Sequence, residues 1–218
     1  MNRKPILWAT AAAVVITTAM SVWAAPRLPA RVPLHWEIGG RPDRFGSPLE
    51  ALLLGPLVSL GIGLLLWALP LVEPRREHLA QSARAYNAVG VVLAGFFVVL
   101  HGATLASGLG WAVPIERLVP AACGLIFVVL GNYLGKTRSN WFFGIRLPWT
   151  LQSERSWAKT HRLGGRLFAG LGAATVLIAL LAPSAVTFAV LVGGLALILV
   201  VCTAYSYREW RLDPARQP

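Results

Sequence analysis

The chain has 218 residues, of which 56% are hydrophobic and only 13% are charged. Soluble chains carry about 25% charged residues, so this composition excludes a disordered chain and a water-soluble enzyme of ordinary surface composition. The net charge of +11 is interpreted as basic loops facing anionic lipid, not as direct binding to nucleic acid. Cys123 and Cys202 lie inside apolar segments without CxxC spacing, and we expect both to be buried apolar residues.

Apolar segments of membrane-spanning length recur along the whole chain. About 20 residues cross a hydrocarbon core of about 30 Å as a helix. The sequence therefore predicts an all-α integral membrane protein with about six transmembrane helices. The predicted spans are Ile6–Ala25, Leu49–Val72, Tyr86–Leu109, Leu118–Leu134, Leu167–Ala182 and Ala185–Tyr205. We divide the chain into residues 1–72, with the first two helices and the loop 26–48; residues 73–134, with helices three and four; and residues 135–218, with a cytoplasmic loop and helices five and six.

The first apolar segment has two interpretations. Basic residues before it and small residues at its end resemble a cleavable secretory signal. Its length of about 20 residues exceeds the usual signal core of about 7–15 residues, and Trp8 and Trp23 mark its two ends as interfacial aromatic residues do. We favour a retained helix, and either alternative leaves the other five spans in the same orientation.

The basic residues set the orientation of the spans. With the N-terminus inside, only five of the 20 Lys and Arg residues lie outside, and these are Arg27, Arg31, Arg41, Arg44 and Arg117. The reverse orientation would violate the excess of basic residues in cytoplasmic loops. We therefore expect both termini in the cytoplasm.

The loop between the first two spans, residues 26–48, is predicted to contain a short strand. Apolar and polar residues alternate from Arg31 to Ile38, whereas Gly39, Gly40 and the segment from Pro42 to Gly46 are predicted to form turns. This loop is either a stiff connector or a binding surface. A metal or acid–base cluster of His35, Glu37 and Asp43 is a weaker alternative, because an HxE pair is common by chance. The candidate partner-binding residues outside the membrane are His35, Trp36, Pro42 and Asp43.

The loop between spans four and five, residues 136–166, is basic and aromatic. A helix is predicted from Thr150 onward, with Thr150 as its N-cap and Glu154 in its first turn. Basic residues from Arg155 to Arg166 share one face, and Trp157, His161 and Phe168 share the opposite one. This pattern predicts an amphipathic helix at the membrane surface, which is either a plain anchor, a docking surface for a cytoplasmic protein or a headgroup pocket. The candidate partner-binding residues on this side are Asn132, Lys136, Arg138, Asn140, Arg146, Trp149, Glu154, Trp157, His161 and Arg162.

The spans contain little chemistry of their own. His101 is the one plainly intramembrane ionisable residue, and we expect it to form a hydrogen bond to a neighbouring helix. The scarcity of charged residues in the spans argues against transport of a small solute. No catalytic motif, metal site or cofactor-binding pattern is recognised, so we expect neither an enzyme nor a cofactor.

The two polar loops together resemble the SdpI family. The residues that carry the resemblance in the inner loop are Gly131-Asn132-Tyr133-Leu134, Lys136-Thr137-Arg138, Asn140, Gly144-Ile145-Arg146, Pro148-Trp149-Thr150-Leu151, Ser153-Glu154, Trp157, Lys159-Thr160-His161-Arg162 and Gly164-Gly165. The outer loop resembles the small extracytoplasmic domain of unknown function that often precedes this region. Its matching residues are Leu28-Pro29, Val32-Pro33, His35-Trp36, Gly40, Pro42-Asp43 and Gly46. Gly135 and Ser139 depart from the family pattern, which has prolines there.

The resemblance implies a multipass protein of the bacterial cytoplasmic membrane. Such a protein gives immunity to a secreted peptide toxin, and it holds a small transcriptional repressor at the membrane as a signal of the toxin. Besides membrane lipid, the implied partners are therefore a toxin outside and a repressor inside. The alternative is a membrane enzyme or lipid-handling protein with Asn140, Arg146, Glu154 and His161 around a headgroup at the inner face.

Overall fold

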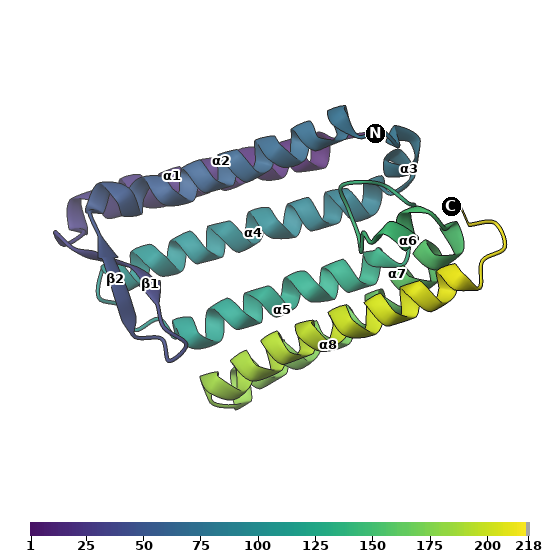
Figure 1. Ribbon diagram of the computed structural model, residues 1–218. Coiled ribbons are helices and arrows are strands. Elements are labelled where there is room, and N and C mark those ends of the chain that lie inside the picture. Colours follow the sequence, from purple (N-terminus) through teal and green to yellow (C-terminus); the bar gives the residue numbers. More distant parts are fainter. Residues whose placement is uncertain (217–218) are drawn as a thin grey trace.

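The computed structural model describes residues 1–216, and long helices dominate these residues (Figure 1). Six helices in this range are long and apolar enough to cross a membrane, which confirms the predicted spans. They are α1 (Lys4–Ala24), α2 (Pro48–Val72), α4 (Ala83–Gly108), α5 (Ile115–Leu134), α7 (Glu154–Leu181) and α8 (Ser184–Arg211). The shorter elements are the 3₁₀ turn η1 (Ala25–Arg27), helices α3 (Arg76–Gln81) and α6 (Pro148–Leu151), and strands β1 (Val32–Trp36) and β2 (Pro42–Gly46).

The long helices form two groups that meet between α4 and α5. Helices α1, α2 and α4 pack on one another, and so do α5, α7 and α8 (Figure 1). Both chain ends lie at one end of the bundle, together with α3 and α6, and the two strands lie at the opposite end. The basic residues concentrate at the end that holds the termini, so the excess of basic residues in cytoplasmic loops predicts that this end faces the cytoplasm and that the strands face outward.

Helices α5 and α7 approach closely because glycines face each other along the contact. A Cβ atom added at Gly131 would lie 2.4 Å from the backbone nitrogen of Ala169, and one added at Gly172 would lie 2.4 Å from the carbonyl oxygen of Gly124. Small residues permit such close packing of helices in lipid, where van der Waals contact replaces the hydrophobic effect as the driving force. These contacts hold the second group of helices together and position the loop between α5 and α7.

Small and polar residues also organise the contact among α1, α2 and α4. The Ser21 hydroxyl on α1 donates to the carbonyl of Leu52 at 2.7 Å and lies 2.9 Å from Nε2 of His101 on α4. Gly55 on α2 leaves room for the His101 ring, since a Cβ there would lie 2.2 Å from Nδ1. His101 is thus bound to a neighbouring helix, as the sequence predicted.

The outer loop folds into an antiparallel hairpin of β1 and β2. The prediction of turns from Pro42 to Gly46 was wrong, because this segment forms β2 and pairs with β1 from Val32 opposite Gly46 to Trp36 opposite Pro42. The chain reverses between the strands at Gly40, whose φ of 79° is accessible mainly to glycine. Val32 is fully buried against Gly108, so the hairpin is anchored on the outer end of α4.

The predicted amphipathic helix is the first part of α7 and continues without a break into the fifth span. It begins at Glu154, and its N-cap is Ser153, whose hydroxyl accepts from the Ser156 amide at 2.9 Å. The prediction of Thr150 as N-cap was wrong, because Thr150 belongs to the separate turn α6. The aromatic face with Trp157 was expected at the membrane surface, but it is buried in the protein. A basic–aromatic pattern does not distinguish lipid from protein as the environment of its apolar face.

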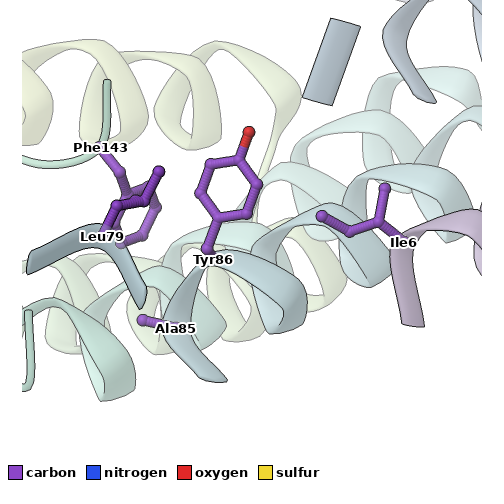
Figure 2. Close-up of a cluster of buried hydrophobic side chains, with 5 residues drawn as sticks. All are labelled: Ile6, Leu79, Ala85, Tyr86 and Phe143. Carbon is purple, nitrogen blue, oxygen red and sulfur yellow. The ribbon is translucent and has the colours of Figure 1, made fainter. Parts of the chain in front are cut away.

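The inner loop, residues 135–153 between α5 and α7, also packs on the first group of helices. Phe143 from this loop joins a buried cluster with Leu79 of α3 and Tyr86 of α4 (Figure 2). The Tyr86 and Phe143 rings meet edge to face with 6.1 Å between their centroids. Ile6 and Ala85 complete the cluster. The cluster therefore joins the N-terminal helices to the loop that follows α5.

Candidate functional site

The outer hairpin presents a pair of titratable side chains across its strands. Nδ1 of His35 lies 2.6 Å from Oδ1 of Asp43, and both side chains are largely exposed. Glu37 instead forms an ion pair of 4.0 Å with Arg41 near the turn. The structure therefore brings His35 and Asp43 together without Glu37, and no group of three metal-binding side chains occurs among residues 1–216. The His35–Asp43 contact links the strands and leaves polar edges open to an external partner.

A recess of about 350 Å³ lies between the hairpin and the outer ends of the helices. Its walls are mainly apolar and include Trp36 of β1, Ile115 of α5 and Phe188 of α8. The acidic residues Glu37 and Glu116 also line it. Two of the four outer candidates, His35 and Trp36, border the recess, whereas Pro42 and Asp43 lie on the exposed strand β2. The recess is thus an apolar site with acidic residues, at the end of the bundle that is predicted to face outward.

Asn140 organises the inner loop from a fully buried position. Its side-chain oxygen accepts from the amides of Phe142 and Phe143 at 3.0 and 2.7 Å. Its side-chain nitrogen donates to the carbonyls of Arg138 and Phe143 at 2.8 and 3.0 Å. All hydrogen-bonding capacity of the amide is used within the loop, so Asn140 shapes this segment and has no group left for a partner.

Trp157 and His161 attach the start of α7 to the same loop. Both are fully buried, and their rings stack with 3.9 Å between centroids. The indole nitrogen of Trp157 donates to the carbonyl of Thr137 at 3.0 Å. His161 lies 2.8 Å from the Trp157 carbonyl through Nδ1, and its Nε2 accepts from the Ile145 amide at 2.9 Å. These two bonds define a neutral imidazole with its proton on Nδ1.

Gly144 fits between the loop and His161. Its φ of 126° lies in a region that favours glycine, and a Cβ at this position would lie 2.4 Å from Nε2 of His161. The loop can therefore approach the imidazole only because Gly144 has no side chain. This contact explains in physical terms why a glycine stands before Ile145 and Arg146.

Buried acidic residues, which the sequence analysis did not identify, support the inner end. Glu73 is 1% exposed and accepts from the amides of Arg75 and Trp141 at 2.9 and 3.0 Å. Glu209 near the end of α8 is 3% exposed and lies 2.9 Å from both Arg155 and Lys159. Because basic residues outnumber acidic ones at this end, each acidic residue there is expected to find a partner. This imbalance of charge was the indication of their role that the sequence offered.

Asp213, just beyond α8, closes the same network. Its carboxylate accepts from the Ser153 hydroxyl at 2.5 Å and from the Ala215 amide at 3.0 Å. The hydrogen bond from Ser153, followed by the one from Ala215, lowers the pKa of Asp213 below its ordinary value despite the opposing effect of burial. The C-terminal segment is thereby attached to the N-cap of α7.

The remaining inner candidates lie on the surface. Trp149 is half-buried and donates from its indole nitrogen to the Ser206 hydroxyl at 2.5 Å. The exposed residues are Asn132, Lys136, Arg138, Arg146, Glu154 and Arg162. The predicted inner site therefore divides into a buried framework of Asn140, Trp157 and His161 and an exposed, mainly basic surface.

The four residues proposed for a membrane enzyme do not converge on one pocket. Asn140 and His161 are buried with their polar atoms bound inside the protein. Arg146 lines an apolar recess between α5 and α8, and Glu154 lines a separate polar recess beside Arg75. This arrangement gives no support to catalysis on a headgroup by these four side chains.

Both the hairpin and almost all of the inner loop lie in regions of the chain that match known protein families. Residues 136–206 match the SdpI/YfhL protein family, and residues 12–60 match a domain of unknown function, DUF1648. A curated relative, Immunity protein SdpI of Bacillus subtilis (strain 168), is 24% identical over 184 residues, which are 84% of this chain and 86% of the relative. No solved structure matches the chain. These findings confirm the resemblance to the SdpI family.

Proposed function

We propose that this SdpI-like multipass membrane protein confers immunity to a secreted peptide toxin in a bacterial cytoplasmic membrane. The observation that carries the proposal is the apolar, acid-lined recess beneath the outer hairpin, in a chain that aligns over 84% of its length with an immunity protein. The proposal requires binding and no catalysis. A bound toxin molecule would be withheld from the lipid bilayer.

The chemistry of the recess indicates the kind of peptide that it accepts. Its apolar walls, with Trp36 and Phe188, suit hydrophobic side chains, and Glu116 suits a nearby basic group. Glu37, by contrast, already forms an ion pair with Arg41. A cation beside Glu116 would be attracted, whereas an anion there would be repelled. We therefore propose that the toxin presents an apolar segment next to a lysine, an arginine or a free amino terminus.

Survival of a toxin-sensitive host tests the outer half of this proposal. The host expresses the chain and is challenged with a panel of secreted antimicrobial peptides, beside variants Trp36→Ala and Asp43→Ala. We expect both variants to lose protection, because the first removes a wall of the recess and the second removes the cross-strand partner of His35. Trp111→Ala is the matched control, since Trp111 is 61% exposed at the same end and does not line the recess.

The membrane level of each variant is measured by immunoblotting of the membrane fraction. Protection that persists in both Trp36→Ala and Asp43→Ala at normal membrane levels would refute recognition by the hairpin. Equal loss in the Trp111→Ala control would show that the effect is a general perturbation of the outer face.

We also propose that the exposed inner surface recruits a small cytoplasmic regulator. Arg146 is the best residue for this test, because it is exposed while its guanidinium donates to the Trp141 carbonyl at 2.5 Å, which fixes its position. Arg146→Ala should reduce membrane retention of a tagged repressor without changing toxin protection. Asn140→Ala is unsuitable, since it removes loop structure as well. Unchanged retention in Arg146→Ala would count against the inner surface.

A further inference from the structure

A shallow groove runs between α5 and α7 at the cytoplasmic edge of the bundle. We name it the α5–α7 groove, and it is lined by Asn132, Gly135, Lys136, Arg162, Gly165 and Arg166, with a volume of about 350 Å³. Its floor is backbone, because a Cβ at Gly135 would lie 3.2 Å from Arg162 and one at Gly165 would lie 2.7 Å from the Gly131 carbonyl. The glycines thus let the backbones of α5 and α7 meet at the floor of the groove, between the basic side chains.

The basic residues of this groove have no acidic partners among residues 1–216. One and two turns before Arg162 on α7, Lys159 and Arg155 both form ion pairs with the single buried carboxylate of Glu209. Arg162 and Arg166 are exposed and form no ion pair in the described part of the chain. Lys136 contacts the Tyr133 ring, with 5.1 Å from Nζ to the centroid, and has no carboxylate beside it. The groove therefore carries three cations whose charge remains available to an external anion.

The distribution of charged residues along α5 and α7 predicts that the groove lies at the depth of the lipid headgroups. Arg166 is the last charged residue before the apolar part of α7, which begins at Leu167. Lys136 follows the uncharged residues 118–135, which form most of α5 and its C-cap. The 28 residues of α7 span about 42 Å as a helix, so its first turns project beyond a hydrocarbon core of about 30 Å. An anion at this position comes most directly from the cytoplasmic leaflet, whose surface is negatively charged.

We propose that the α5–α7 groove binds the phosphate-bearing headgroup of an anionic phospholipid. Guanidinium groups bind phosphate oxygens through two parallel hydrogen bonds, and Arg162 and Arg166 supply two such groups on one helix face. Lys136 adds a third cation from α5, and the Asn132 amide adds a neutral donor. A lipid held there bridges α5 and α7 where their glycine contact ends. This site is separate from the outer recess and does not depend on immunity.

Native mass spectrometry of the purified full chain in detergent tests the proposal. The probes are phosphatidylglycerol and phosphatidylethanolamine, titrated separately. We expect the wild type to prefer phosphatidylglycerol and the double variant Arg162→Gln with Arg166→Gln to bind it about 25-fold more weakly, since each basic residue at an anionic surface changes binding about fivefold. The double variant Arg162→Lys with Arg166→Lys should retain most of the binding, because it keeps both charges.

The matched control is Arg208→Gln with Arg211→Gln, which removes two exposed charges from the cytoplasmic end of α8. It should leave phosphatidylglycerol binding within about twofold of the wild type, because exposed charges away from a site act weakly on it. An equal loss in control and groove variants would overturn the proposal, since general attraction to the basic end would then explain binding. Absence of any preference for phosphatidylglycerol in the wild type would overturn it too.

Discussion

Replacing Asn140 by alanine should destabilise the protein strongly, although sequence analysis placed Asn140 among the partner-binding residues. The change removes one acceptor that serves two backbone amides and one donor group that serves two carbonyls. The position is fully buried, so water cannot replace these partners without opening the loop. Polar backbone groups left unpaired in a buried place carry the full cost of their lost solvation.

The magnitude follows from the burial of the individual bonds. The two bonds to the backbone of Phe143 are buried, and those to Phe142 and Arg138 are partly exposed. With about 1.5 kcal/mol for each buried bond and about 0.5 kcal/mol for each partly exposed one, Asn140→Ala should lower the free energy of unfolding by about 4 kcal/mol. Asn132→Ala is the matched control, because Asn132 is exposed and its loss should change stability by less than about 0.5 kcal/mol.

Equilibrium unfolding in mixed detergent micelles, followed by tryptophan fluorescence, measures both values. Trp141 and Trp149 lie in the inner loop and Trp157 donates to it, so these residues report on its packing. A loss below about 1 kcal/mol in Asn140→Ala, or equal losses in the two alanine variants, would refute the assignment of Asn140 to the loop framework. Asn140→Asp should fall between the wild type and Asn140→Ala, since it keeps the acceptor and removes the donor.

Two further predictions concern helix packing and pH. Gly131→Val should destabilise the protein by about 3 kcal/mol or more in the same assay, because its Cβ would meet the Ala169 backbone, whereas Gly170→Val, with open space around it, should not. Asp213→Asn should destabilise the protein at neutral pH, because the pKa of Asp213 is lowered in the folded state, chiefly by Ser153. This stabilisation is present above the unfolded-state pKa of about 3.9 and is lost as the pH falls through the lower folded-state pKa. The difference in free energy of unfolding between Asp213→Asn and the wild type should therefore shrink below about pH 4. A pH-independent difference, or equal effects of the two valine variants, would contradict these explanations.

The spans were predictable because hydrophobic length is a property of the chain alone. The hairpin was only half predictable. Alternation identified β1, but the segment from Pro42 to Gly46 consists of residues common in turns and becomes a strand through pairing with β1. The N-cap of α7 was misplaced by three residues, because both Thr150 and Ser153 have hydroxyl groups suited to an N-cap.

The candidate site was harder to predict than the fold, because the same residue types serve structure and recognition. Asn140 and His161 are polar residues at a membrane edge, a pattern that indicates function, yet their polar atoms are satisfied inside the loop. Burial separates them from exposed Arg146, and burial depends on tertiary contacts that the local sequence does not encode. Glu73 and Glu209 were missed for the same reason, since only the fold brings their partners to them.

The position of the inner loop also limits how the two ends of the protein can communicate. The loop is attached to the first group of helices through the Ser82 hydroxyl, which accepts from the Arg138 amide at 2.9 Å, and through Phe143 on Tyr86. At the other end of α4, Gly108 carries the hairpin at Val32. Helix α5 likewise borders the outer recess at its first turn and enters the inner loop at its last. Helix α8 does the same, since Phe188 borders the outer recess and the Ser206 hydroxyl accepts from Trp149 of the inner loop. Under the proposed function, the most direct routes for a relay from toxin to regulator therefore run along α4, α5 and α8, because these three helices contact both the hairpin end and the inner loop.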